Sequence, residues 1–134
     1  MARIKGPAED VIRIGRQSTY EVVFSFKYLQ ENKTETKNKG AHLHAFLLRL
    51  KKLSELGWKE IRKSPKHSFG TEMIPLKQFR IKKNEIPIIT DDVSKLTVFR
   101  ASGDNKVFAG IEVENLFYII VIEYDFGDYY LPHK

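Results

Sequence analysis

The chain contains no cysteine and no long apolar run. The absence of cysteine excludes disulfides, thiolate nucleophiles and cysteine-ligated zinc. No apolar stretch approaches the roughly 20 residues that a membrane-spanning helix needs, and the first ten residues lack the apolar centre of a signal peptide. We therefore expect a soluble protein of the cytoplasm, without contact to a membrane.

Several signatures of catalysis are also missing. The sequence has no phosphate-binding loop of the Gly-x-x-x-x-Gly-Lys type, no dinucleotide fingerprint and no Gly-x-Ser-x-Gly turn. His42 and His44 are two positions apart, so they point to different sides of a helix, and His67 and His133 are distant from them. We expect neither a metal site nor a cofactor.

The length of 134 residues, with 42% hydrophobic and 12% aromatic residues, predicts one packed domain over 1–134. Residues 1–17 mix charges with glycine and proline and predict a loosely held arm or a short strand near Val11–Ile14. Residues 30–40 are polar throughout and predict a mobile loop that is long for a compact domain.

Two kinds of periodicity predict the regular elements. Residues 19–29 alternate aromatic or β-branched residues with others, as strands do. Apolar residues then recur at helical spacing over three turns, at Leu43, Phe46, Leu47, Leu50 and Leu53. Gly57 suits the end of that helix, a shorter helix is expected over 58–63, and Pro65 stops it.

The second half predicts a sheet. Residues 66–75 are expected to form a loop, followed by strands at 76–81, 96–100, 107–113 and 116–124, with turns at 102–105 and 114–115. Strand 116–122 is apolar on both faces, as in an interior strand. Most of 82–95 is expected to be a connection, with three isoleucines tucked against the core. The fold class is α+β: a strand, then two helices packed on one face of an antiparallel sheet of three to five strands.

Positive charge is concentrated in the middle of the chain. Between Arg49 and Lys83, eleven Lys or Arg stand against three acids, a net charge of +8, whereas residues 84–134 carry −5. Trp58, His67 and Phe69 lie within the basic segment. Such a segment suits a nucleic-acid backbone, although a solvated basic surface is the simpler explanation.

The segment from Lys63 to Glu72 gathers groups that could cleave RNA. Two lysines, an imidazole and a carboxylate lie within ten residues that also contain Pro65 and Gly70. Cleavage of a phosphodiester through the 2′-OH requires a base, cations at the phosphorane and an acid, but no metal. Glu72 or His67 could be the base, with Lys63 and Lys66 as cations; a plain surface loop is the alternative.

Arginines and tyrosines of the second half extend this site. Arg100 alternates with Leu96 and Val98 and so shares their face, and Arg80 holds a similar position on the preceding predicted strand. The two arginines could clamp one phosphate, or form ion pairs with Glu112, Glu123 or Asp125. Tyr124, Tyr129 or Tyr130 could stack on a base or donate a proton, and His133 could act as an acid.

The order of elements and these residues together resemble the RelE/ParE superfamily of bacterial toxins. Residues 99–107 and 117–125 resemble the closing hairpin of such proteins. The resemblance covers roughly residues 19 to 130. It implies a toxin of a toxin–antitoxin system, acting as a ribosome-dependent messenger-RNA endonuclease and restrained by an antitoxin protein.

The resemblance also implies roles for individual residues. Glu72, His67, Arg100 and Tyr124 would be catalytic. Taken with the basic segment, we expect contacts to RNA from Lys59, Arg62, Lys63, Lys66, Arg80, Lys82 and Tyr130. Because ParE-type members inhibit DNA gyrase, the alternative is a non-catalytic protein that binds nucleic acid or gyrase through the same basic surface.

Overall fold

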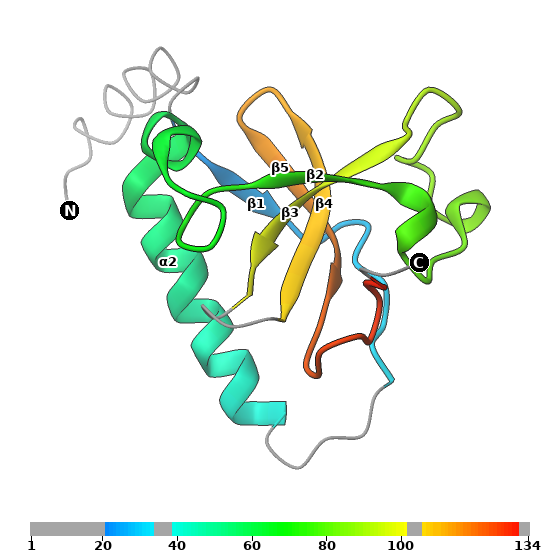
Figure 1. The fold of residues 1–134 in the computed structure, drawn as a ribbon, viewed down its shortest axis with the longest axis horizontal. Helices are drawn as coiled ribbons and strands as arrows, with labels where there is room; N and C mark the ends of the chain where they lie inside the picture. The colour runs from blue at the N-terminus through cyan, green and yellow to red at the C-terminus, as the bar shows by residue number, and fades with distance from the viewer. Residues whose placement is uncertain (1–20, 34–38, 102–105, 132–134) are drawn as a thin grey trace, which may run out of the picture.

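A computed structural model describes residues 21–33, 39–101 and 106–131. The predicted arm over 1–17, the centre of the polar loop and the turn at 102–105 lie outside the described residues. The described elements are one long helix, five strands and two short 3₁₀ turns, which confirms the α+β class (Figure 1). No helix among these residues combines the length and the apolar character needed to cross a bilayer.

The helix α2, Lys39–Lys63, unites the two helices that were predicted separately. Gly57 lies inside it with φ 76° and ψ 168°, a backbone conformation that is not helical and that glycine adopts without a Cβ penalty. The predicted end at Gly57 is therefore a kink, after which Trp58 and Ile61 are again buried. The indole Nε1 of Trp58 donates to the Asn115 carbonyl at 3.0 Å and fixes the second part of α2 to the sheet.

The buried side of α2 is narrower than its apolar sequence. Phe46, Leu50 and Leu53 are buried, whereas Leu43 and Leu47 are exposed by 41% and 52%. Successive helical residues are about 100° apart, so Leu47 lies on the flank of the helix when Phe46 faces the sheet. Leu43 and Leu47 thus belong to the apolar stripe predicted from the sequence but not to the buried side of α2.

The sheet is mixed rather than antiparallel, with strand order β1-β5-β4-β3-β2. The strands are β1 Val23–Ser25, β2 Glu72–Pro75, β3 Lys95–Arg100, β4 Val107–Val113 and β5 Leu116–Ile122. Neighbouring strands from β2 to β5 pair antiparallel, but β1 pairs parallel with β5, because the chain passes through α2 before it returns to the sheet.

Two predictions were wrong around Pro75, one of a loop and one of a strand. The segment predicted as a loop contains β2, and the strand predicted over 76–81 is instead the 3₁₀ turn η1, Leu76–Gln78, followed by an irregular stretch. Only Phe79 of that stretch pairs as a strand residue, in an isolated antiparallel bridge to Tyr130. In the first half, β1 is shorter than the predicted strand over 19–29, of which residues 19 and 20 are not described.

The sheet carries a core on each face. On one face, α2 packs against a cluster of aromatic rings in which Phe99 and Phe108 stack at 4.8 Å. On the other, the connection between β2 and β3, which includes the 3₁₀ turn η2 at Lys83–Glu85, covers Ile74, Leu96 and Val98. Ile86 and Ile89 of that connection are buried, as expected. Arg100 ends β3 at the margin of this second core.

Candidate functional site

A small pocket lies at the end of β3, on the face opposite α2. Its lining includes Lys66, Glu72, Arg100 and Tyr130, with Ile74 and Val98 among the apolar residues around them. The volume is about 40 Å³. This space holds a few water molecules, so a phosphate group would occupy its mouth with only some of its oxygens inside.

Alternation along the strands brings Glu72 and Arg100 to the same face. Glu72 is paired with Val98 across β2 and β3, and Arg100 lies two residues beyond Val98. Lys66 lies across from Glu72, with 3.6 Å between its Nζ and the Glu72 Oε1. The pocket therefore combines two cationic side chains and one carboxylate with an apolar lining.

His67 is attached to this group through Arg100. The Arg100 Nη2 lies 3.0 Å from the His67 Nδ1. Because a guanidinium can only donate, the Nδ1 accepts this hydrogen bond, and the hydrogen of the neutral ring is then on Nε2. In this arrangement His67 can offer a hydrogen through Nε2, but its Nδ1 lone pair is already used.

The loop 64–70 that carries Lys66 and His67 is fixed by its own hydrogen bonds. The amides of Ser68 and Gly70 donate to the Pro65 carbonyl at 2.9 and 3.0 Å, and the Phe69 amide donates to the Ser64 Oγ at 3.1 Å. A Cβ on Gly70 would lie 2.1 Å from the Ser64 carbonyl oxygen, so only glycine fits there.

Arg49 is a residue that sequence reasoning missed as part of the site, because it entered only the charge count. From α2 it donates to the backbone carbonyls of Ser68 and, at 3.3 Å, of Arg100. Its guanidinium lies 4.3 Å from the centre of the Phe69 ring. Burial lowers the pKa of Arg49. Arg49 thus ties the loop 64–70 and the end of β3 to one helix.

Tyr130 reaches the pocket because Glu123 holds the segment after β5. The buried carboxylate of Glu123 accepts hydrogen bonds from the amides of Val107, Tyr129 and Tyr130 at 2.9 to 3.1 Å. Burial raises the pKa of the Tyr130 phenol, and the negative charge of Glu72 raises it further, against the opposing effect of Arg100. The phenol therefore keeps its proton at neutral pH.

Other residues predicted for the site lie elsewhere. Tyr124 does not line the pocket; its ring lies 4.9 Å from the Lys39 Nζ. Arg80 is exposed and is not among the lining residues either, so it does not belong to the group that meets in the pocket with Arg100. The loss of the predicted strand over 76–81 explains this difference. Lys82 is exposed at the start of η2.

The basic residues at the end of α2 have their own surroundings. Arg62 forms an ion pair with Glu112 and lies over the Trp58 ring at 4.9 Å. Lys63 lies 3.8 Å from Glu60, and Lys59 is exposed. The Glu112 carboxylate, one predicted partner of Arg80 or Arg100, is thus paired with Arg62. Together, Lys59, Arg62 and Lys63 form a basic flank before the loop 64–70.

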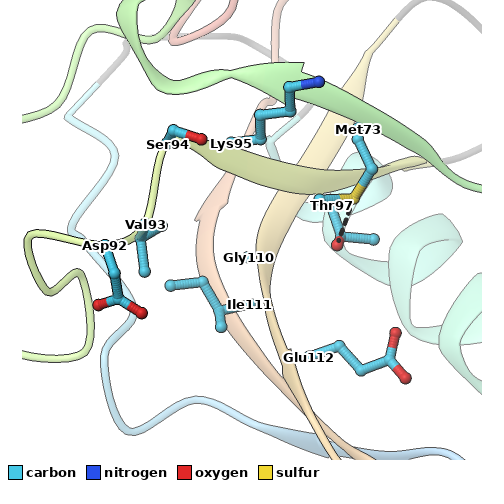
Figure 2. A pocket seen from close by; sticks show the side chains of 9 residues that line it. All are labelled: Met73, Asp92, Val93, Ser94, Lys95, Thr97, Gly110, Ile111 and Glu112. Atoms are coloured by element: carbon cyan, nitrogen blue, oxygen red, sulfur yellow. Dashed lines mark hydrogen bonds between the residues drawn. The ribbon is translucent and has the colours of Figure 1, made fainter.

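A larger groove of about 410 Å³ lies at the opposite end of β3 (Figure 2). Gly110 and Thr97 lie along it, and the Thr97 Oγ1 contacts the Met73 Sδ at 3.2 Å. Figure 2 shows the carboxylates of Asp92 and Glu112 on opposite sides of this groove. Two carboxylates and one cation, Lys95, line this groove, whereas two cations and one carboxylate line the smaller pocket, so the smaller pocket is the better anion site.

No group of three or more His, Asp or Glu side chains among residues 21–33, 39–101 and 106–131 could hold a metal ion. Comparison with protein-family models, curated proteins and solved structures found no match for this chain.

Proposed function

We propose that the chain is an endoribonuclease that cleaves RNA without a metal ion. The observation that carries the proposal is the meeting of Lys66, Glu72, Arg100 and Tyr130 in one pocket, with His67 on Arg100. These groups come from a loop, two strands and the segment after β5. They supply the base, the cations and the proton donors that cleavage through the 2′-OH requires.

Each group has a role in this reaction. Glu72 takes the 2′-OH proton, and the 2′ oxygen then forms a bond to phosphorus. Lys66 and Arg100 stabilise the negative charge of the phosphorane. When the bond from phosphorus to the 5′ oxygen breaks, that oxygen receives a proton from the Tyr130 phenol. The products are a 2′,3′-cyclic phosphate and a free 5′-OH.

The resemblance to the RelE/ParE superfamily extends this proposal to a biological role. On that basis we propose a toxin of a toxin–antitoxin system, with ribosome-bound messenger RNA as its substrate and an antitoxin protein as its partner in the cytoplasm. The basic flank of Lys59, Arg62 and Lys63 would contact RNA outside the pocket.

Expression in a bacterial host tests the proposal. The parent chain should arrest growth and produce new 5′ ends in message, phased with codons. Glu72→Ala and Arg100→Ala should relieve the arrest and lower cleavage by about 100-fold or more, because each removes a group that acts in the transition state. Circular dichroism must show that both variants are folded.

Lys52→Ala is the matched control, because Lys52 is an exposed cation on the outer side of α2. It should leave growth arrest and cleavage unchanged. If the Glu72 and Arg100 variants stay folded and remain as toxic as the parent, the assignment of the site is wrong.

A second candidate is binding without catalysis. It is favoured by the ion pair of Lys66 and Glu72, because that pair partly neutralises the carboxylate that a base must provide. A protein of this kind would bind polynucleotides with strong salt dependence or cause supercoiling defects through gyrase, and message would keep its normal 5′ ends.

A further inference from the structure

An apolar groove with lysines beside it lies next to the pocket. Leu76, Phe79 and Ile81 supply its apolar lining, Lys77 and Lys83 its charges, and its volume is about 300 Å³. Both lysines are exposed. A groove that combines an apolar surface with two cations is poorly suited to a purely apolar ligand, because the positive charges would lose water without gaining a partner.

The groove and the pocket are joined through one pair of rings. Phe79 lines the groove and Tyr130 lines the pocket, and their ring centres are 5.5 Å apart with an interplanar angle of 30°. The same two residues form a β-bridge, and the Arg80 amide donates to the Tyr129 carbonyl at 2.8 Å. The two sites are therefore held side by side by backbone pairing.

We propose that this groove holds a base of single-stranded RNA next to the phosphodiester in the pocket. The proposal rests on the proposed function, which places a phosphate between Lys66 and Arg100. An apolar floor gains free energy when it covers the face of a base, and Lys77 and Lys83 would contact the neighbouring phosphates. Bases of a duplex are stacked and paired, so the ligand is an unpaired strand.

Binding of two strands of equal charge tests the groove. One probe is a fluorescein-labelled strand of ten 2′-O-methyl uridines, which lacks the 2′-OH and cannot be cleaved. The other has the same backbone with abasic sites at the interior positions. Fluorescence anisotropy at low salt should show that the parent binds the uridine strand about tenfold more tightly, because its bases cover the apolar lining of the groove.

Two serine variants separate the groove from the rest of the surface. Ile81→Ser should remove most of the preference for the uridine strand. Val113→Ser, which alters an exposed aliphatic residue at the end of β4, should keep it. Equal affinity of the parent for both strands would overturn the inference, as would a folded Ile81→Ser variant that keeps the full preference.

The groove and the proposed function can fail independently. If the base preference depends on Ile81 but no message is cleaved, the groove stands and the ribonuclease assignment falls. If message is cleaved and the parent does not distinguish the two strands, the ribonuclease assignment stands and the groove is not a base site.

Discussion

Glu123 is the residue on which the geometry of the pocket depends most. Its side chain is 2% exposed, and its two oxygens accept hydrogen bonds from three backbone amides. Two of these amides belong to Tyr129 and Tyr130, so the carboxylate sets the position of the phenol in the pocket. Burial raises the pKa of Glu123 above its ordinary value of 4.5, although the three amides lower it.

This shift predicts how stability depends on pH. A carboxyl whose pKa is raised in the folded state binds its proton more tightly there than in the unfolded chain. The contribution of Glu123 is therefore fully present below pH 4.5 and is lost as pH rises through the raised value. The free energy of unfolding should therefore decline between pH 4 and 8, and the part of this decline that Glu123 causes should be absent in Glu123→Gln. Urea denaturation across this pH range measures both chains. An equal decline in the variant would contradict this assignment.

At the scale of elements, the loop 64–70 is held in place by its own hydrogen bonds and by Arg49. Its backbone turns back on itself so closely that the Gly70 Cα approaches the Ser64 carbonyl, while Arg49 holds it from α2. Lys66 and His67 are thus presented by a rigid element, which lowers the cost of positioning them at a phosphate.

Gly70→Ala should disturb this element. The added methyl group would overlap the Ser64 carbonyl oxygen, so the loop must move, at a cost of about 1–3 kcal/mol in the free energy of unfolding. The cleavage rate of the folded protein should also fall, because Lys66 and His67 move with the loop. Gly40→Ala is the control, since nothing lies within 4 Å of a Cβ at Gly40. Unchanged cleavage in Gly70→Ala would show that the loop is not part of the site.

Elements with strong local patterns were predictable from the sequence. The strand predicted over 107–113 has the observed bounds, and the helical spacing of Phe46, Leu50 and Leu53 identified the side of α2 that is buried. Residues 72–81 were not predictable, because β2 is only four residues long, does not alternate in polarity and ends in Pro75, a residue that disfavours a strand. The parallel pairing of β1 with β5 has no local signal at all.

The site residues also differ in how far the sequence could identify them. Alternation on β3 correctly placed Arg100 on the face of Leu96 and Val98, and the clustering of charge selected Lys66 and Glu72. Arg80 was grouped with them through a strand that does not form. Arg49 was missed because its contacts are to backbone carbonyls, which any sequence contains.

At the scale of the whole molecule, positive charge is separated along the chain, with the basic segment 49–83 preceding the acidic second part. Lys66 brings part of this charge into the pocket, whereas the exposed end of α2 carries Lys59, Arg62 and Lys63. Affinity for a polynucleotide should therefore depend on many cations, of which few are in the pocket.

Salt dependence can count the contact made by Lys66. Affinity falls as salt rises, and for single strands each neutralised phosphate adds about 0.7 to the magnitude of the negative slope of log affinity against log salt. Lys66→Ala should lower that magnitude by about 0.7 in titrations of the ten-uridine strand, and Lys52→Ala should leave it unchanged. If the two variants have the same slope, Lys66 does not contact phosphate.

The pocket is built from positions as far apart in the chain as Lys66 and Tyr130. During translation, a nascent chain that has not yet reached residue 130 lacks the phenol, its bridge to Phe79 and hence one wall of the pocket. A growing polypeptide would therefore expose its basic segment to the RNA around it before the groups that line the pocket could come together. If the proposed ribonuclease activity holds, the transcript being translated would be safe from its own product until residue 130 has emerged and paired with Phe79.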